Sequence, residues 1–121
     1  MSQSKRELGR LGEELAARYL RRQGYLIRER NWSCPWGEID IVAEEDDCLA
    51  FVEVRTRRGR EFGTPEESIT PVKQSKLIEV AQAYLQEHSW SGDWRIDVVA
   101  VELTPHGRLQ RVELIRNAVT R

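Results

Sequence analysis

The feature that most constrains the fold of this chain is an acid in the middle of an apolar, β-branched segment. Residues 50–56 read AFVEVRT, so Glu53 lies between two valines. Aromatic and β-branched residues of this kind favour a strand within a packed sheet. An ionised carboxylate is rarely buried in such a strand unless it has a partner. The segment therefore predicts a sheet strand whose acid has a specific role.

A second acid is predicted to lie beside Glu53. Residues 38–44 alternate between polar and apolar and predict another strand, joined to the first by a short acidic turn. If the two strands form a hairpin in which Glu45 pairs with Cys48, then Asp40 stands directly opposite Glu53. The Cβ atoms of such a pair lie about 4.5–5.5 Å apart. The hairpin therefore brings two carboxylates together on one face of the sheet.

Two like charges that face each other destabilise a sheet, and the repulsion can be relieved in two ways. Either one carboxyl group keeps its proton through a raised pKa, or a hard cation such as Mg²⁺ or Mn²⁺ binds to both. Such an ion can activate a bound water and stabilise the charge that develops at a scissile phosphate. The alternative is an ordinary hairpin with a polar, solvated outer face.

Arg55 follows Glu53 by two residues, and side chains two apart on a strand share a face. Its guanidinium is suited to contacting a phosphate or stabilising an attacking hydroxide. It cannot act as a general base, because arginine stays protonated. The alternative is a plain ion pair with Glu38, which the same register places opposite Arg55.

The rest of the sequence predicts a single α/β domain over residues 1–121. Gly24 is typical of a helix end, and Thr70-Pro71 is typical of a helix start. The predicted elements are a helix at 5–23, strands at 25–31, 38–44 and 49–56, a helix at 71–87 and strands at 94–103 and 109–116, with loops at 32–37 and 57–69. The order is therefore α-β-β-β-α-β-β.

Composition excludes several classes of protein. The chain is 40% hydrophobic and 32% charged, which is typical of a globular domain and not of a disordered one. Its net charge of -1 means that a polyanion would have to bind to a local basic patch. The sequence contains neither a signal peptide nor an apolar run of about 18 residues, and its two cysteines match no zinc spacing. We therefore expect a cytoplasmic protein that does not enter a membrane.

Both predicted helices carry candidate site residues. Lys73 and Gln74 lie at the start of the second helix, at the edge of its apolar stripe, where a cation would reinforce anion binding by the helix N-terminus. The alternative for Lys73 is a solvated position at the helix start. Glu13 falls just beyond a face of small residues that includes Gly12 and suggests close approach to the sheet. The acid could reach the active edge of the sheet or could simply be solvated.

Two further groups of residues are candidates for contacting nucleic acid. Trp32 and Trp36 flank the predicted loop before the second strand, where aromatic rings beside basic residues can stack on unpaired bases. Their alternative role is packing at the end of the sheet. Arg57, Arg58 and Arg60 follow the strand of Glu53 and are suited to phosphate contacts. Their alternative is a solvated charged loop.

The sequence as a whole resembles a known family. Five motifs in a fixed order, covering the chain from Gly9 to about Ala118, resemble the YraN-like uncharacterised protein family: GRLGEELAARYL, GEIDIVA, FVEVRTR, FGTPEESITPVKQSKL and RIDVVAV. The resemblance implies membership of the restriction-endonuclease-like PD-(D/E)xK superfamily, which includes archaeal Holliday-junction resolvases. It implies a three-layer fold in which a mixed central sheet is flanked by helices. Because those resolvases act as dimers, it also raises a homodimer as an expectation.

The resemblance also implies roles for individual residues. Asp40 matches the motif aspartate, and Glu53-Val54-Arg55 matches the (D/E)xK element. The metal is then implied to lie between Asp40, Glu53 and the carbonyl group of Val54. Glu13 resembles the N-terminal helical acid of the resolvases, and Gln74 resembles the glutamine that often follows the core motif.

The chain departs from the superfamily pattern at one position, because Arg55 stands where lysine is preferred. Arginine can still hold a phosphate, and Lys73 is a candidate to replace the lysine. Three hypotheses follow: a Mg²⁺- or Mn²⁺-dependent nuclease whose candidate substrates include branched DNA, a nucleic-acid-binding module with weak or no catalysis, and a non-catalytic structural or protein-interaction domain. Retention of Asp40 together with Glu53 favours the first hypothesis, whereas Arg55 favours the second.

Overall fold

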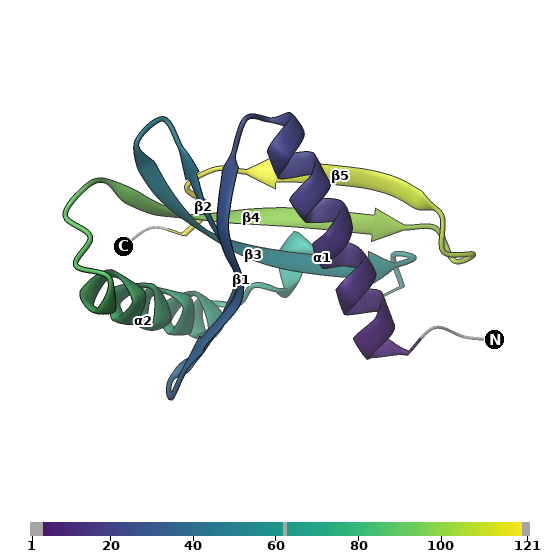
Figure 1. Cartoon of the computed structure of the whole chain (residues 1–121). Coiled ribbons are helices and arrows are strands. Elements are labelled where there is room, and N and C mark those ends of the chain that lie inside the picture. The colour runs from purple at the N-terminus through teal and green to yellow at the C-terminus, as the bar shows by residue number, and fades with distance from the viewer. Residues whose placement is uncertain (1–3, 62, 120–121) are drawn as a thin grey trace.

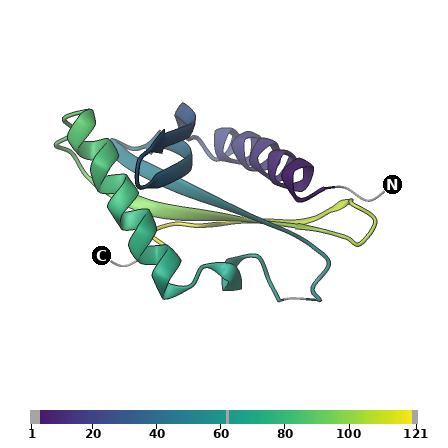
Figure 2. The ribbon, with the colours of Figure 1, turned by 90° about the horizontal axis from the view of Figure 1, so that it is seen from below.

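The computed structural model describes residues 4–61 and 63–119 and contains one five-stranded sheet with a helix on each face (Figures 1 and 2). The strands lie in the order β1-β2-β3-β4-β5; β3 and β4 are parallel, and the other neighbours are antiparallel. The elements are α1 (Lys5–Arg22), β1 (Leu26–Cys34), β2 (Gly37–Glu45), β3 (Cys48–Arg58), the 3-10 turn η1 (Glu66–Ser68), α2 (Pro71–Glu87), β4 (Trp94–Leu103) and β5 (Leu109–Ile115). The predicted order of helices and strands and the three-layer arrangement are confirmed.

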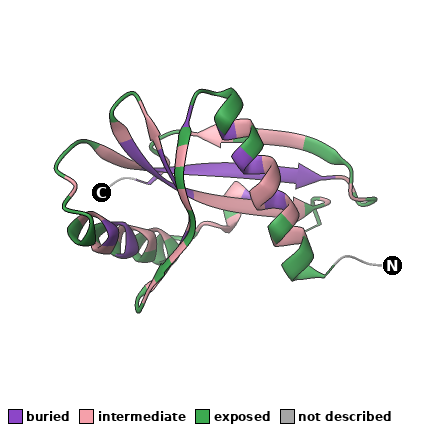
Figure 3. Ribbon diagram, viewed as in Figure 1, coloured by how far each residue is buried: buried purple, intermediate pink, exposed green. Residues whose placement is uncertain are grey.

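The two faces of the sheet carry separate apolar cores. On one face, α1 packs through Ala16 and Leu20 against a cluster that includes Val52. On the other, α2 packs through Val80 and Tyr84 against a second cluster. β4 is buried along most of its length, as Figure 3 shows, which is expected of a strand with neighbours on both edges and a covered face. Within the described residues, neither helix is long and apolar enough to cross a membrane.

Local sequence signals position both helices. The Ser4 hydroxyl caps α1 by accepting a hydrogen bond from the Glu7 N–H, and the Thr70 hydroxyl caps α2 in the same way from the Lys73 N–H. The predicted close approach of α1 to the sheet is confirmed at Gly12. A Cβ atom there would lie 1.8 Å from the Thr56 hydroxyl oxygen, so no larger residue fits without a shift.

The hairpin of β2 and β3 has the predicted register. Asp46 and Asp47 both adopt positive φ angles, 48° and 64°, as a two-residue type I′ turn requires. Glu45 pairs with Cys48, and the pairing continues in register up to Ile41 and Val52. It stops there, one step before Asp40 and Glu53.

Beyond that point β2 leaves β3 but stays paired with β1. The pairing of β1 with β2 continues to Cys34 and Gly37, so the tip of this hairpin projects away from the sheet (Figure 1). The edge of β3 from Glu53 onward is consequently not covered by a strand on that side. This separation of β2 from β3 is what creates the candidate site.

Two predicted element boundaries are wrong. The expected loop at 32–37 is mostly strand, with only Pro35 and Trp36 left as the turn, because Trp32 pairs across the hairpin with Ile39 and packs on Tyr84. The expected loop at 57–69 begins two residues later, because β3 remains paired with β4 as far as Arg58. Both extensions depend on partners that are distant in sequence.

Candidate metal centre

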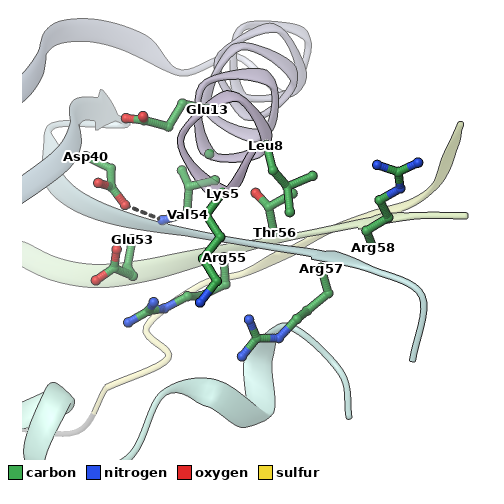
Figure 4. A pocket seen from close by; sticks show the side chains of 11 residues that line it. Lys5, Leu8, Glu13, Asp40, Glu53, Val54, Arg55, Thr56, Arg57 and Arg58 are labelled. Atoms are coloured by element: carbon green, nitrogen blue, oxygen red, sulfur yellow. Dashed lines mark hydrogen bonds between the residues drawn. The ribbon is translucent and has the colours of Figure 1, made fainter. Parts of the chain in front are cut away.

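A cleft of about 440 Å³ lies between the first half of α1 and the uncovered edge of β3 (Figure 4). Most of the predicted site residues line it. They are Glu13, Asp40, Glu53, Val54, Arg55, Arg57 and Arg58, joined by Lys5, Leu8, Gly9 and Thr56. The cleft thus combines residues from three elements at the point where β2 and β3 separate.

The Asp40 side chain accepts a hydrogen bond from β3 at the point where the backbone of β2 no longer pairs with it. The Val54 N–H donates to the Asp40 carboxylate (Oδ2) at 2.8 Å, which replaces the missing ladder bond (Figure 4). In an extended strand the N–H and C=O groups of one residue point to the same edge. The Val54 carbonyl group therefore faces the same open edge as Asp40.

The carboxyl groups of Asp40 and Glu53 lie close enough to share a proton. Burial, and then the hydrogen bond with Glu53 and its negative charge, raise the pKa of Asp40 to about 8. The Val54 N–H and the positive charge of Arg55 act in the opposite direction but do not outweigh these causes. The pair therefore holds a proton near neutral pH, and a divalent cation is the chemical species that could displace that proton.

Glu13 projects from α1 toward Asp40 (Figure 4). One of its carboxylate oxygens, Oε1, is buried and accepts no hydrogen bond. Burial, followed by the charge of Asp40, raises the pKa of Glu13. The positive charge of Arg30 acts in the opposite direction but does not outweigh these causes. The cleft thus contains a third carboxyl group whose proton affinity is raised by its surroundings.

The donor set fits Mg²⁺ or Mn²⁺ on chemical grounds. Within residues 4–61 and 63–119, no three His, Cys, Asp or Glu side chains lie close enough together to hold one ion. Mg²⁺ does not need three, because it is usually held by one or two carboxylates with water completing the shell. Asp40, Glu53 and the Val54 carbonyl group would supply such a set, with Glu13 beside it.

Arg55 lies on the face of β3 that is turned toward α2. No ion pair joins it to Glu38 in the described part of the chain, so the simple cross-strand pair is not what holds it. Its Nε atom is buried without a hydrogen-bond partner. Arg55 is thus a cation beside the acid pair that still has a donor to offer.

Lys73 lies near Glu53 in a second cleft, whereas Gln74 lies in a separate pocket away from the acids. Lys73 lines a second cleft of about 170 Å³, between β3 and the start of α2, to which Glu53 and Arg55 also contribute. Its ammonium group donates to the Ser68 carbonyl oxygen at 3.2 Å. Gln74 donates to the Ile69 carbonyl oxygen and lines a separate pocket, so the structure does not bring it to the acids.

The three predicted phosphate-binding arginines have different surroundings. Arg57 lines the cleft, and its Nε atom is buried without a partner. Arg58 also lines the cleft but donates to the Pro105 carbonyl oxygen at 2.8 Å. Arg60 forms a bidentate ion pair with buried Glu102. Its guanidinium is thus paired within the fold, although 62% of the side chain stays exposed.

The two tryptophans lie away from the acid pair. Trp32 is half-buried and meets the Tyr84 ring edge-on at a centroid distance of 5.1 Å, which matches the alternative of packing at the sheet end. Trp36 is 52% exposed at the hairpin turn. Together they line a groove against the last turns of α2, not the cleft of Asp40.

Sequence reasoning missed three residues that matter. Lys5 lines the cleft, although it reads only as the first residue of a helix. Asp97 and Glu102, both on β4, are buried acids held by arginines. The signal for Asp97 was present, since the segment RIDVVAV places an acid in an apolar strand just as AFVEVRT does.

The chain is similar in sequence to a known protein family and to individual members of it. The model of the Uncharacterised protein family UPF0102 matches residues 12–101. A UPF0102 protein of Pelotomaculum thermopropionicum is 46% identical over 119 residues, which cover 98% of this chain and 99% of that protein. A UPF0102 protein of Roseiflexus castenholzii is also 46% identical, over 98% of each chain. On the strength of these matches, the chain belongs to the Uncharacterised protein family UPF0102.

Proposed function

We propose that the protein is a divalent-metal-dependent nuclease that hydrolyses phosphodiester bonds in nucleic acid, with DNA as the proposed substrate. One observation carries the proposal: Asp40 and Glu53 face each other at an uncovered strand edge, inside a cleft lined by cations. A pair of carboxyl groups that must share a proton is unfavourable for the fold and favourable for holding a hard cation.

The proposed chemistry assigns a separate task to each group. A bound Mg²⁺ or Mn²⁺ would lower the pKa of a water and polarise the phosphate. Asp40 and Glu53 would hold the ion, and Arg55 would contact the phosphate oxygens that gain charge during the reaction. Hydrolysis adds the water oxygen to phosphorus and breaks one phosphorus–oxygen ester bond, which leaves a phosphate end and a hydroxyl end.

One observation favours a second candidate, a binding module with weak or no catalysis. Arg55 cannot give up its proton, so it cannot take over the role of a lysine that deprotonates a water. Lys73 is separated from the main cleft and is bonded to the Ser68 carbonyl oxygen. Under this candidate the cleft binds nucleic acid and metal but turns over slowly.

A cleavage assay separates the two candidates. The protein is incubated with single-stranded, linear double-stranded and four-way-junction DNA in Mg²⁺ and in Mn²⁺, beside Glu53→Gln and Glu7→Gln. Glu7 is an exposed acid of α1 outside the cleft and serves as the matched control. We expect cleavage by the wild type and by Glu7→Gln, and none by Glu53→Gln.

The other outcomes are equally informative. Cleavage that survives in Glu53→Gln would come from a contaminant or another site and would rule out this assignment. Binding of DNA without cleavage by any of the proteins would favour the second candidate. Absence of both DNA binding and metal binding would leave only a structural or protein-interaction role.

A further inference from the structure

Glu53 of the acid pair borders two clefts, whereas Asp40 lines only the larger of them. The larger cleft of about 440 Å³ opens toward α1, and the smaller one of about 170 Å³ opens toward the start of α2. Glu53 and Arg55 line both. The acids therefore lie along a path around the uncovered edge of β3 and not at the closed end of a pocket.

Cations line this path on both sides of the acid pair. Lys5 and Arg57 border the larger cleft, and Lys73 and Lys76 border the smaller one. No ion pair engages Lys5 or Arg57 in the described part of the chain, and the contact of Lys76 with Glu79 is long, at 4.0 Å. Lys73 donates to the Ser68 carbonyl oxygen, and the acid Glu38 also lines the smaller cleft. The cations that a polyanion could engage directly are therefore Lys5, Arg57 and Lys76.

Two buried donors along β3 lack partners. The Nε atoms of Arg55 and Arg57 are buried and make no hydrogen bond with any part of the chain that the structure describes. The two residues are two apart on one strand face, so their Cα atoms are separated by about 6.6 Å. That spacing is comparable to the distance between neighbouring phosphates in an extended nucleic-acid strand. Two successive phosphates would satisfy both donors.

We propose that this path holds one continuous strand of nucleic acid, with phosphates bound on both sides of the acid pair. Arg57 and Lys5 bind the strand in the larger cleft, and Lys73 and Lys76 bind it in the smaller one. The smaller cleft has a volume of only about 170 Å³, so the proposed occupant is a single strand and not a duplex. The inference rests on the proposed function of the acid pair and adds that cleavage is internal to a strand.

Salt-dependent binding tests the path independently of cleavage. Fluorescence anisotropy follows binding of a labelled single-stranded oligonucleotide to the full chain in EDTA, which prevents metal-dependent cutting. The proteins are the wild type, Arg57→Ala, Lys76→Ala and the control Arg21→Ala, which removes an exposed cation of α1 outside both clefts. For Arg57→Ala and for Lys76→Ala, we expect several-fold weaker binding and a slope of log affinity against log salt smaller by about 0.7.

Arg21→Ala should leave both quantities unchanged. If only Arg57→Ala weakens binding, the nucleic-acid strand binds in the larger cleft alone and the proposal is wrong. An equal loss in all three variants would show general charge attraction without a path, and no binding by the wild type would also overturn the proposal.

A circular substrate then tests internal cleavage. In Mg²⁺ or Mn²⁺ the wild type should convert circular single-stranded DNA to linear molecules. Degradation of linear but not circular strands would overturn the proposal while leaving the nuclease assignment intact. If neither form is cut, the proposed function fails, and the salt slopes still decide whether the binding path exists.

Discussion

The buried acids of β4 and the acid pair at the open edge of β3 differ in what surrounds them. Asp97 is fully buried, and it accepts hydrogen bonds from Arg95, from the Tyr25 hydroxyl at 2.7 Å and from a backbone N–H. Asp40 is less buried, but its nearest ionisable partner is another carboxyl group. Burial is therefore common to structural and candidate functional acids. The two kinds differ in the sign of the neighbouring charge.

The same contrast appears in the pKa values of Glu102 and Asp40. Hydrogen bonds from Arg60 and Arg111 lower the pKa of Glu102 to about 2, so its charged form stabilises the fold. Burial and Glu53 raise the pKa of Asp40, so its charged form destabilises the fold. The ion pairs of the β4 acids stabilise the fold. The two neighbouring carboxyl groups at the edge of β3 destabilise it, and a bound cation would relieve their repulsion.

The largest expected effect of a substitution is at Asp97. Asp97→Ala removes one of the two carboxylates that pair with Arg95. It also leaves the Tyr25 hydroxyl without its hydrogen-bond acceptor. We expect the free energy of unfolding to fall by about 3–5 kcal/mol, as for other broken buried ion pairs. Urea unfolding measures the change, and Asp97→Asn should show a smaller loss of the same sign. A loss below about 1 kcal/mol for Asp97→Ala would mean that this acid is not structural.

The stability of the fold is also expected to depend on pH. Because the pKa of Asp40 is higher in the folded than in the unfolded chain, the folded state binds the proton more tightly. Stability should therefore fall as pH rises from about 4 to about 8, by at most about 1.4 kcal/mol per pH unit. Glu102 acts in the opposite sense: its contribution is complete above about pH 4.5 and is lost as pH falls through about 2.

Thermal unfolding in metal-free buffer at several pH values tests this contrast. Asp40→Asn should abolish the decline toward pH 8 and keep the acid-side loss of stability. If the variant and the wild type decline in parallel, the proton is not held by the acid pair.

The smallest effect is expected for Glu53→Gln. The substitution replaces the carboxyl group that shares a proton with Asp40 by an amide of the same shape. The amide can donate a hydrogen bond to Asp40, so Asp40 no longer has to keep a proton to avoid a like charge. We expect stability at neutral pH to rise by about 0.2–1 kcal/mol, which is the range for relieving a like-charge pair in a sheet. Chemical denaturation measures the difference. A clear destabilisation would show that Glu53 is a structural acid like those of β4.

The sequence predicted the part of the site that depends on local pattern. Alternation within 38–44 and 50–56, together with the short acidic turn between them, was sufficient to predict that Asp40 and Glu53 come together on one face of the sheet. The register was confirmed as far as Ile41 and Val52. The separation of the strands beyond that point was not predictable from alternation, because it depends on how the tip of the β1–β2 hairpin packs on α2.

The parts that were missed depend on contacts between distant residues. Arg60 reads as a loop arginine until its partner is known, and that partner, Glu102, lies 42 residues later on a buried strand. Lys5 reaches the cleft only because α1 crosses β3 closely at Gly12. Neither relation leaves a periodic signal in the sequence, whereas the acid pair does.

Calorimetric titration with Mn²⁺ tests the central claim most directly, namely that Asp40 and Glu53 form a site for a divalent cation. Wild type and Asp40→Asn are compared, because asparagine can still accept the Val54 hydrogen bond while losing the charge. We predict one ion bound per wild-type chain, tighter at higher pH because binding must displace the shared proton, and affinity at least about tenfold weaker in Asp40→Asn. Equal affinities for the two proteins, or no binding by the wild type at any pH, would contradict the account.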